Sequence, residues 1–263
     1  MYKLQPLTEV RTVLGETQEF IDGNIRSALK RGLPWLSGCE EVKDGPLAIV
    51  AGGPSLSWTK DDLRKFGNVM ACGSSHDWCI ANGVKPNYTV LLDPAEIVCD
   101  WLKTPDKDCL YLVASQCAPN VFDTLKDYRV GVWHAAAEKM IPELEGMQLI
   151  GGGCTAALRA ISLAIILGYH DLHLFGFDSC IWDNEKSHAY SVDDVHKNMI
   201  RDRKAIVHFN GRQFVCAPYM IAQALNFKDI LKLWREHFTP TVYGDGLIAE
   251  ICKSPDSDLM VRA

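Results

Sequence analysis

The residues best suited to chemistry stand in the loop Gly52-Gly53-Pro54-Ser55, directly after the apolar run Leu47–Ala51. A short, wholly apolar run predicts a buried parallel strand, and the two glycines let the backbone turn tightly and lie against a ligand. Ser55 can cap a helix that continues from Trp58 to Lys65. A strand, a glycine turn and a helix start together predict a site for a phosphate or ribose. The alternative is an ordinary turn that binds nothing.

This loop matches neither of the common nucleotide motifs. It lacks the third glycine of GxGxxG near Leu56, and it does not end in the Gly-Lys-Ser/Thr of a phosphate-binding P-loop. Any nucleotide binding here therefore uses a different Rossmann-like variant.

A second glycine loop repeats the same logic. Gly151, Gly152 and Gly153 follow an apolar run and lead through Thr155 into the most hydrophobic helical stretch of the chain. Three successive glycines are costly in backbone entropy, so a packing or binding reason is expected. We predict backbone contact with a phosphate or sugar at these four residues. Close packing between helix and strand is the alternative.

Two further predicted strands end in carboxylates. Asp93 follows Val90-Leu91-Leu92, and Asp178 follows Phe175-Gly176-Phe177. Ligands of open α/β sheets bind beyond the carboxyl ends of the strands, so both carboxylates are expected beside the two glycine loops. Carboxylates of this kind can also hold a Mg²⁺ ion that bridges donor phosphates, and Asp93 and Asp178 are the candidate ligands.

The histidine of the run Ser187–Tyr190 is the candidate general base. His188 lies in a polar stretch after Asp178, and a histidine with a pKa near neutral can take a proton from an acceptor hydroxyl. We predict His188 and Asp178 as the catalytic pair; a solvated loop histidine is the alternative. His134 and His196 are weaker candidates.

The elements that must position these residues alternate between strands and helices from residue 45 to 176. This rhythm predicts an α/β fold with a Rossmann-like, mostly parallel sheet that carries helices on both faces. Residues 1–44 are interpreted as an N-terminal helical arm and residues 45–263 as the Rossmann-like domain. The expected strands are Leu47–Ala51, Asn68–Cys72, Tyr88–Leu92, Cys109–Ala114, Arg129–Trp133, Gln148–Ile150 and Leu172–Phe175. Further on we expect a hairpin over Val207–Val215, a long helix over Ala217–Phe238, a strand over Thr241–Tyr243 and a glycine turn after it.

Composition limits the class of protein. The net charge of −6 argues against nonspecific nucleic-acid binding, although Arg201, Arg203 and Lys204 could form a local basic patch. The ten cysteines contain no CxxC pair, which argues against a zinc ribbon. No apolar stretch reaches a membrane-spanning length. We therefore expect a reduced, soluble, cytoplasmic protein without a membrane partner.

Several motifs together resemble a known family. The runs AGGPSL, PNYTVLLD, GGGCTAALRAISLAIILGYHDLHLFGFD and SHAY are similar to the Rossmann-like 6-hydroxymethylpterin diphosphokinases of archaea and their bacterial and phage relatives. Bacterial sialyltransferases and flagellin-modifying glycosyltransferases are more distantly similar. The chain carries LLDPAE where the diphosphokinases carry a TDLDG-like run, and it has no clear match to their HAHGDN-like run.

The resemblance implies a transferase that binds a nucleotide or nucleotide-sugar and a small-molecule acceptor. The first hypothesis is diphosphoryl transfer from a nucleoside triphosphate to a hydroxymethylpterin-like acceptor, with Mg²⁺. The second is glycosyl transfer from a nucleotide-sugar, with His188 as base and no strict need for metal. The third is a non-catalytic nucleotide binder. Metal dependence separates the first two, and turnover separates both from the third.

Overall fold

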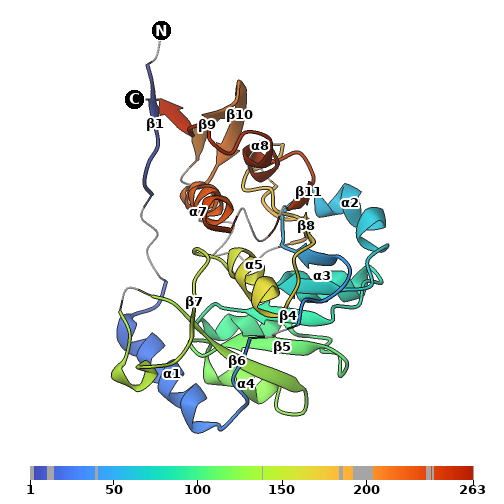
Figure 1. The fold of residues 1–263 in the computed structure, drawn as a ribbon, viewed down its shortest axis with the longest axis vertical. Coiled ribbons are helices and arrows are strands. Elements are labelled where there is room, and N and C mark those ends of the chain that lie inside the picture. Colours follow the sequence, from blue (N-terminus) through green and yellow to red (C-terminus); the bar gives the residue numbers. More distant parts are fainter. Residues whose placement is uncertain are drawn as a thin grey trace.

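A parallel sheet of eight strands forms the centre of the molecule (Figure 1). The structure, a computed structural model, describes residues 3–10, 15–38, 41–137, 139–183, 186–191, 204–234, 238 and 240–262. In spatial order the strands are β11 (Thr241–Tyr243), β8 (Leu172–Phe175), β2 (Leu47–Val50), β3 (Val69–Cys72), β4 (Tyr88–Leu91), β5 (Leu110–Ala114), β6 (Arg129–Ala135) and β7 (Leu149–Ile150). All seven pairings between neighbours are parallel. The predicted parallel sheet is confirmed.

Both faces of the sheet are covered, as the apolar strands require. Successive side chains of a strand point to opposite faces. Leu47 and Ile49 of β2 accordingly join one buried cluster, which also contains Ile161. Ala48 and Val50 join a second cluster, which contains residues of α2 and α3. A strand such as β2 therefore needs apolar residues on both of its faces, and this explains its continuous apolar run.

Helices connect the strands. Thr17 begins the first one, because its hydroxyl oxygen accepts a hydrogen bond from the Phe20 amide at 3.2 Å. The connection after β4 is a short 3₁₀ helix, Glu96–Trp101. The helices are α1 (Gln18–Lys30), α2 (Leu56–Leu63), α3 (Ser75–Ala81), η1 (Glu96–Trp101), α4 (Pro119–Thr124), η2 (Pro142–Leu144), α5 (Ala156–Ile166), α7 (Pro218–Trp234) and α8 (Leu247–Lys253).

A small antiparallel sheet stands beside the large one, with the order β1-β12-β9-β10. The hairpin of β9 (Ala205–Phe209) and β10 (Arg212–Cys216) turns at Asn210-Gly211, as predicted. The other two strands are β1 (Leu4–Pro6) and β12 (Met260–Arg262), which pair antiparallel. Figure 1 shows the two ends of the chain side by side at this sheet.

The first 44 residues are less helical than the sequence predicts. Within the described part of this segment, only α1 is helical, and residues 4–6 form a strand. Gly32 has a φ of +62°, beyond the end of α1, and Pro34 then extends the chain. The Pro34 carbonyl accepts from the Val132 amide at 2.8 Å, and the Leu36 amide donates to the Val132 carbonyl at 2.7 Å. This segment thus runs along β6. Its assignment as a separate arm stays a prediction.

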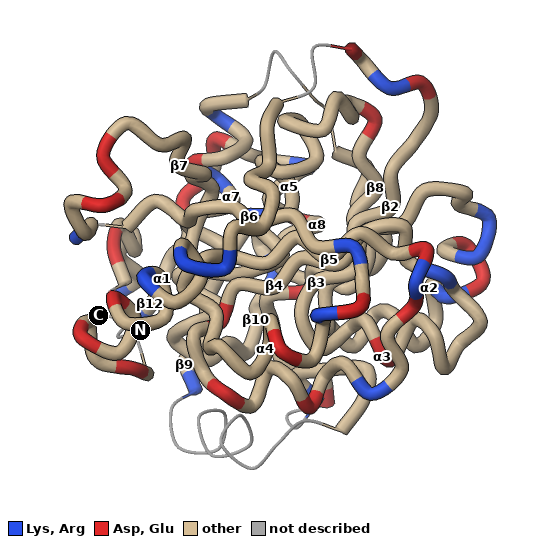
Figure 2. The backbone as a smooth tube through the Cα atoms, turned by 90° about the horizontal axis from the view of Figure 1, so that it is seen from below, with Lys and Arg blue, Asp and Glu red and all other residues tan. Residues whose placement is uncertain are grey.

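Charge and thiols are spread through the fold. Figure 2 shows acidic and basic residues interspersed along the backbone.

The nine cysteines in the described ranges are free thiols. Within those ranges, no helix has both the length and the apolar character needed to cross a bilayer.

Candidate functional site

The candidate site lies where the strand order changes direction. The next strand along the chain, β3, pairs with one side of β2. Strand β8, which comes much later in the sequence, pairs with the other side of β2. The loop Gly52–Ser55 follows β2, and Asp178 follows β8, so these two predicted features are neighbours. A crevice at such a switch point is the usual ligand position in doubly wound sheets.

Asp178 is bonded to the glycine loop itself. The Ser55 amide donates to Asp178 Oδ2 at 2.9 Å, and the Gly53 amide donates to the Gly176 carbonyl at 2.9 Å. Asp178 is only 3% exposed. Burial raises the pKa of its carboxyl above the usual range, while Ser55 and the Trp182 indole act to lower it.

These contacts explain why residue 53 is a glycine. A Cβ at Gly53 would lie 2.2 Å from Asp178 Oδ2 and 2.4 Å from the Gly176 carbonyl oxygen. The loop needs a glycine here to pack against β8, whether or not a ligand approaches. A valine at Gly53 would therefore disturb the fold, and it cannot serve as a test of ligand access alone. In this structure the Ser55 amide, which could otherwise bind a ligand anion, donates to the carboxylate of Asp178.

The segment Ser187–Tyr190, here called the His188 strap, lies over the same loop. The Ala189 amide donates to the Gly52 carbonyl at 3.0 Å, and the Tyr190 hydroxyl is 2.8 Å from Ser74 Oγ at the start of α3. A Cβ at Gly52 would lie 2.6 Å from His188 Cδ2 and 2.7 Å from the Tyr190 hydroxyl. The imidazole is therefore packed directly against the first glycine. His188 Nδ1 is 3.0 Å from Ser187 Oγ.

The turn after β11 encloses the other side of Asp178. The Leu247 amide donates to the Asp178 carbonyl at 2.8 Å. A Cβ at Gly244 would lie 2.7 Å from the Ser55 Cβ, and one at Gly246 would lie 2.5 Å from the Asp178 carbonyl oxygen. The glycine turn predicted for this stretch thus belongs to the same cluster of loops.

The second glycine loop is held mainly by its own helix. Gly152 and Gly153 have φ values of +117° and +96°, which favour glycine. Cβ atoms there would come within 2.5 Å of Ser162 Oγ and 2.7 Å of a Leu158 methyl, respectively. Arg159 donates to the carbonyls of Gly153, Ile150 and Ala136. These contacts favour the packing alternative for Gly152 and Gly153. Gly151 is exposed, with open space where a Cβ would stand.

Thr155 nevertheless connects this loop to the switch point. Its hydroxyl oxygen caps α5 by accepting from the Leu158 amide at 3.3 Å, and it also accepts from Gln223 Nε2 at 3.2 Å. Gln223 Oε1 in turn accepts from Ser179 Oγ at 2.8 Å, next to Asp178. Thr155 is therefore connected to the neighbour of Asp178 by hydrogen bonds through Gln223 of α7, a residue that the sequence analysis did not identify.

Asp93 lies elsewhere on the sheet edge. It follows β4, and two strands separate β4 from β8, which corresponds to about 14 Å at the usual strand spacing. The carboxylate is exposed, and its Oδ1 accepts from the Ala95 amide at 2.9 Å. Among the described residues, no three His, Cys, Asp or Glu side chains converge on one point. Asp93 and Asp178 do not lie on adjacent strands, and their role as metal ligands stays a prediction.

Two tryptophans at the rim of the site were not identified from the sequence. Trp58 in the first turn of α2 packs edge to face on Trp182, with ring centroids 5.2 Å apart. Trp58 is 53% exposed, so part of its ring surface is accessible to a ligand. The two positions are distant in the sequence, and no local pattern connects them.

The weaker histidine candidates fall outside this cluster. His134 is buried in β6, with Nδ1 2.6 Å from Ser115 Oγ and its ring stacked on Trp35. Burial lowers the pKa of His134 to about 4, so it is neutral at pH 7. His196, Arg201 and Arg203 lie outside the described residues.

The parallel sheet and its switch-point loops define an α/β protein of the Rossmann-like class. A family model described as 6-hydroxymethylpterin diphosphokinase MptE-like matches residues 23–184. The chain therefore belongs to this family, which confirms the resemblance seen in its motifs, and the family supports a transferase-type function.

One solved structure shows the same fold in another protein. The MAf glycosyltransferase from Magnetospirillum magneticum AMB-1 aligns with a TM-score of 0.68 and 18% identity, covering 89% of this chain. The aligned part is 38% of that larger chain, so this protein spans well under half of its length. No curated protein matches the chain.

Proposed function

We propose that this chain is a transferase that moves a group from a nucleotide-activated donor to a small-molecule acceptor. The observation that carries the proposal is the packing of His188 against Gly52 at the switch point of the sheet. A donor bound at this loop would place its reacting group beside the His188 strap, at the position where doubly wound sheets bind nucleotides.

His188 would act as the general base. In the tautomer whose Nδ1–H donates to Ser187 Oγ, the Nε2 atom keeps its lone pair. A Cβ at Gly52 would stand 3.3 Å from Nε2, so this nitrogen faces the loop. It could take the proton of an acceptor hydroxyl as that oxygen attacks the donor.

The first candidate reaction is diphosphoryl transfer to a hydroxymethylpterin-like acceptor, in keeping with the family. The acceptor oxygen would form a bond to the β-phosphorus of a nucleoside triphosphate, the bond between the β-phosphorus and the α,β-bridging oxygen would break, and the nucleoside monophosphate would leave. Mg²⁺ would offset the phosphate charge. The exposed Asp93 fits a hydrated Mg²⁺, which keeps several waters and needs one or two carboxylates. The buried Asp178 fits it less well.

The second candidate is glycosyl transfer from a nucleotide-sugar. It is favoured by the carboxylate of Asp178, which already meets the Ser55 amide at the start of α2. A triphosphate placed there would face this negative charge. A base or sugar ring could instead pack against the exposed indole of Trp58.

A thermal-shift matrix decides between the donor classes. We expect one of ATP, GTP, CTP, CMP and UDP to raise the melting temperature, measured with and without Mg²⁺. A ligand at about 100 times its Kd adds roughly 2.7 kcal/mol to the free energy of unfolding. A triphosphate that stabilises only with Mg²⁺ supports diphosphoryl transfer, and CMP or UDP without metal supports glycosyl transfer. No shift with any nucleotide would contradict the proposal.

Turnover then separates an enzyme from a binder. Formation of a nucleoside monophosphate that depends on a hydroxymethylpterin would support the first reaction. Tight nucleotide binding without turnover of either donor class would leave the non-catalytic alternative.

Gly52→Ala should lower turnover by roughly 10²-fold with little loss of stability. The three atoms nearest to the added methyl belong to the side chains of His188 and Tyr190, so the His188 strap must shift while the backbone of the loop stays in place. Misplacement of a reacting group by about 1 Å can cost this much. The measurements are initial rates and melting temperatures.

Gly67→Ala is the matched control, because nothing lies within 4 Å of a Cβ at that glycine. Gly151→Ala, where the space is equally open, tests whether the second glycine loop touches the ligand. An unchanged rate in Gly52→Ala would show that the position of the His188 strap does not matter for the reaction.

A further inference from the structure

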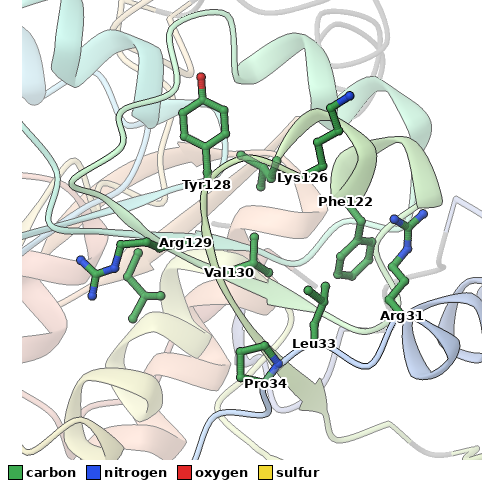
Figure 3. A pocket seen from close by; sticks show the side chains of 10 residues that line it. Arg31, Leu33, Pro34, Phe122, Lys126, Tyr128, Arg129 and Val130 are labelled. Carbon is green, nitrogen blue, oxygen red and sulfur yellow. The ribbon is translucent and has the colours of Figure 1, made fainter.

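A separate cavity of about 600 Å³ opens at the opposite edge of the sheet. It lies at the amino ends of β5 and β6, where Leu110 and Val130 belong to its wall, whereas the switch-point loops follow the carboxyl ends of β2 and β8. Its size falls in the range of small-molecule sites. Figure 3 shows the side chains that line it: Arg31, Leu33, Pro34, Leu110, Phe122, Leu125, Lys126, Tyr128, Arg129 and Val130.

The charged side chains of this cavity are all cationic. Arg31, Lys126 and Arg129 line it, and no carboxylate does. Arg31 is paired with Asp123 at 2.8 Å. Arg129 donates to the Asp108 backbone carbonyl at 3.3 Å, which leaves its charge unneutralised. Over the part of the chain that the structure describes, neither Lys126 nor Arg129 has an ion-pair partner.

Between the cations the surface is apolar and aromatic. In Figure 3, Arg129 stands on one side and Arg31 and Lys126 on the other, with Val130 and Leu33 between them. The Arg31 guanidinium carbon lies 5.2 Å from the centroid of the Phe122 ring. The aromatic rings and aliphatic floor favour a ligand with a flat apolar body, and the cations favour a negative charge on it.

We propose that this cavity binds a small organic anion with a planar apolar body, such as an aromatic carboxylate, sulfonate or phosphate. The proposal is independent of the transferase site, because no residue is shared between them. Arg31 caps the end of α1, Phe122 lies in α4, and Leu33 and Pro34 belong to the segment that runs along β6. A bound anion would hold these three parts together.

The test compares two fluorescent probes that differ by one charge. 8-Anilinonaphthalene-1-sulfonate carries a sulfonate on a planar naphthalene ring with an anilino substituent, and N-phenyl-1-naphthylamine has the same skeleton without the sulfonate. We expect the sulfonate to bind folded protein at one site at least tenfold more tightly than the neutral probe. Raising the salt concentration should weaken only the sulfonate, since salt screens charge.

Charge reversal locates the site. The double variant Lys126→Glu with Arg129→Glu should weaken sulfonate binding at least tenfold and leave binding of the neutral probe unchanged. Arg129→Lys should retain binding. Lys85→Glu, a single charge reversal at an exposed lysine outside the cavity, is the control and should bind both probes as the unmodified protein does. Melting temperatures confirm that each variant is folded.

Three results would overturn the proposal. These are equal affinity for the two probes, sulfonate binding that the double variant does not weaken, and no binding of the sulfonate at all. The second result would place the anion elsewhere, including at the switch point.

Discussion

His188→Ala is expected to lower turnover by about 10²–10⁴-fold, the usual contribution of a general base, while donor affinity stays nearly unchanged. The histidine packs against Gly52 with its side chain, and the strap itself is held by backbone and tyrosine contacts from Ala189 and Tyr190. Removing the imidazole therefore leaves the strap attached. The loss should appear in kcat and not in the Kd of the donor.

The pH dependence of kcat gives a second readout. A general base must be unprotonated to act, so the activity of the unmodified protein should fall in acid, and this fall should be absent from the residual activity of His188→Ala. His170→Ala is the matched control, since His170 precedes β8 at the opposite edge of the sheet. Full activity of His188→Ala would show that this histidine does not act in the reaction.

The large sheet could be predicted because its strands are buried on both faces. The run Leu47–Ala51 has no polar position, and Leu172–Phe175 has only one, the half-buried His173. The first 44 residues were harder to predict. Strand β1 has no apolar run of its own, because its pairing with β12 depends on a distant part of the chain.

Only those site residues that directly follow a predicted strand could be identified from the sequence. Glycine turns and carboxylates after apolar runs mark one edge of a sheet, but the order of strands along that edge is not local information. Asp178 proves to be adjacent to Gly53, while Asp93 stands two strands farther away. Contacts through Gln223 and Trp58 likewise join segments that are remote in the sequence.

Asp178→Ala should lower the free energy of unfolding by about 1–3 kcal/mol and weaken donor binding. The Ser55 amide would lose its acceptor inside the protein, and leaving a buried donor unpaired costs about this much. The loops of Gly53 and Gly246 both pack against Asp178, so the switch point would loosen as well. Urea unfolding and donor titration measure the two effects.

Asp178→Asn separates hydrogen bonding from charge. The amide keeps an oxygen that can accept from Ser55, so this variant should be at least as stable as the unmodified protein at neutral pH. Burial raises the folded-state pKa of Asp178 above its unfolded value. The stability that the carboxyl contributes is therefore fully present below the unfolded pKa and is lost as pH rises through the folded pKa.

The stability of the unmodified protein, measured relative to Asp178→Asn, should accordingly fall as pH rises from about 3 and level off above the folded pKa. A relative stability that rises with pH would mean that hydrogen bonds to the carboxylate outweigh the cost of burying its charge. The charge of Asp178 would then stabilise the loop. The carboxylate would hinder a triphosphate more strongly, because the group would stay ionised in the folded protein. A fall with pH would instead mean that protonation removes that barrier in mildly acidic solution.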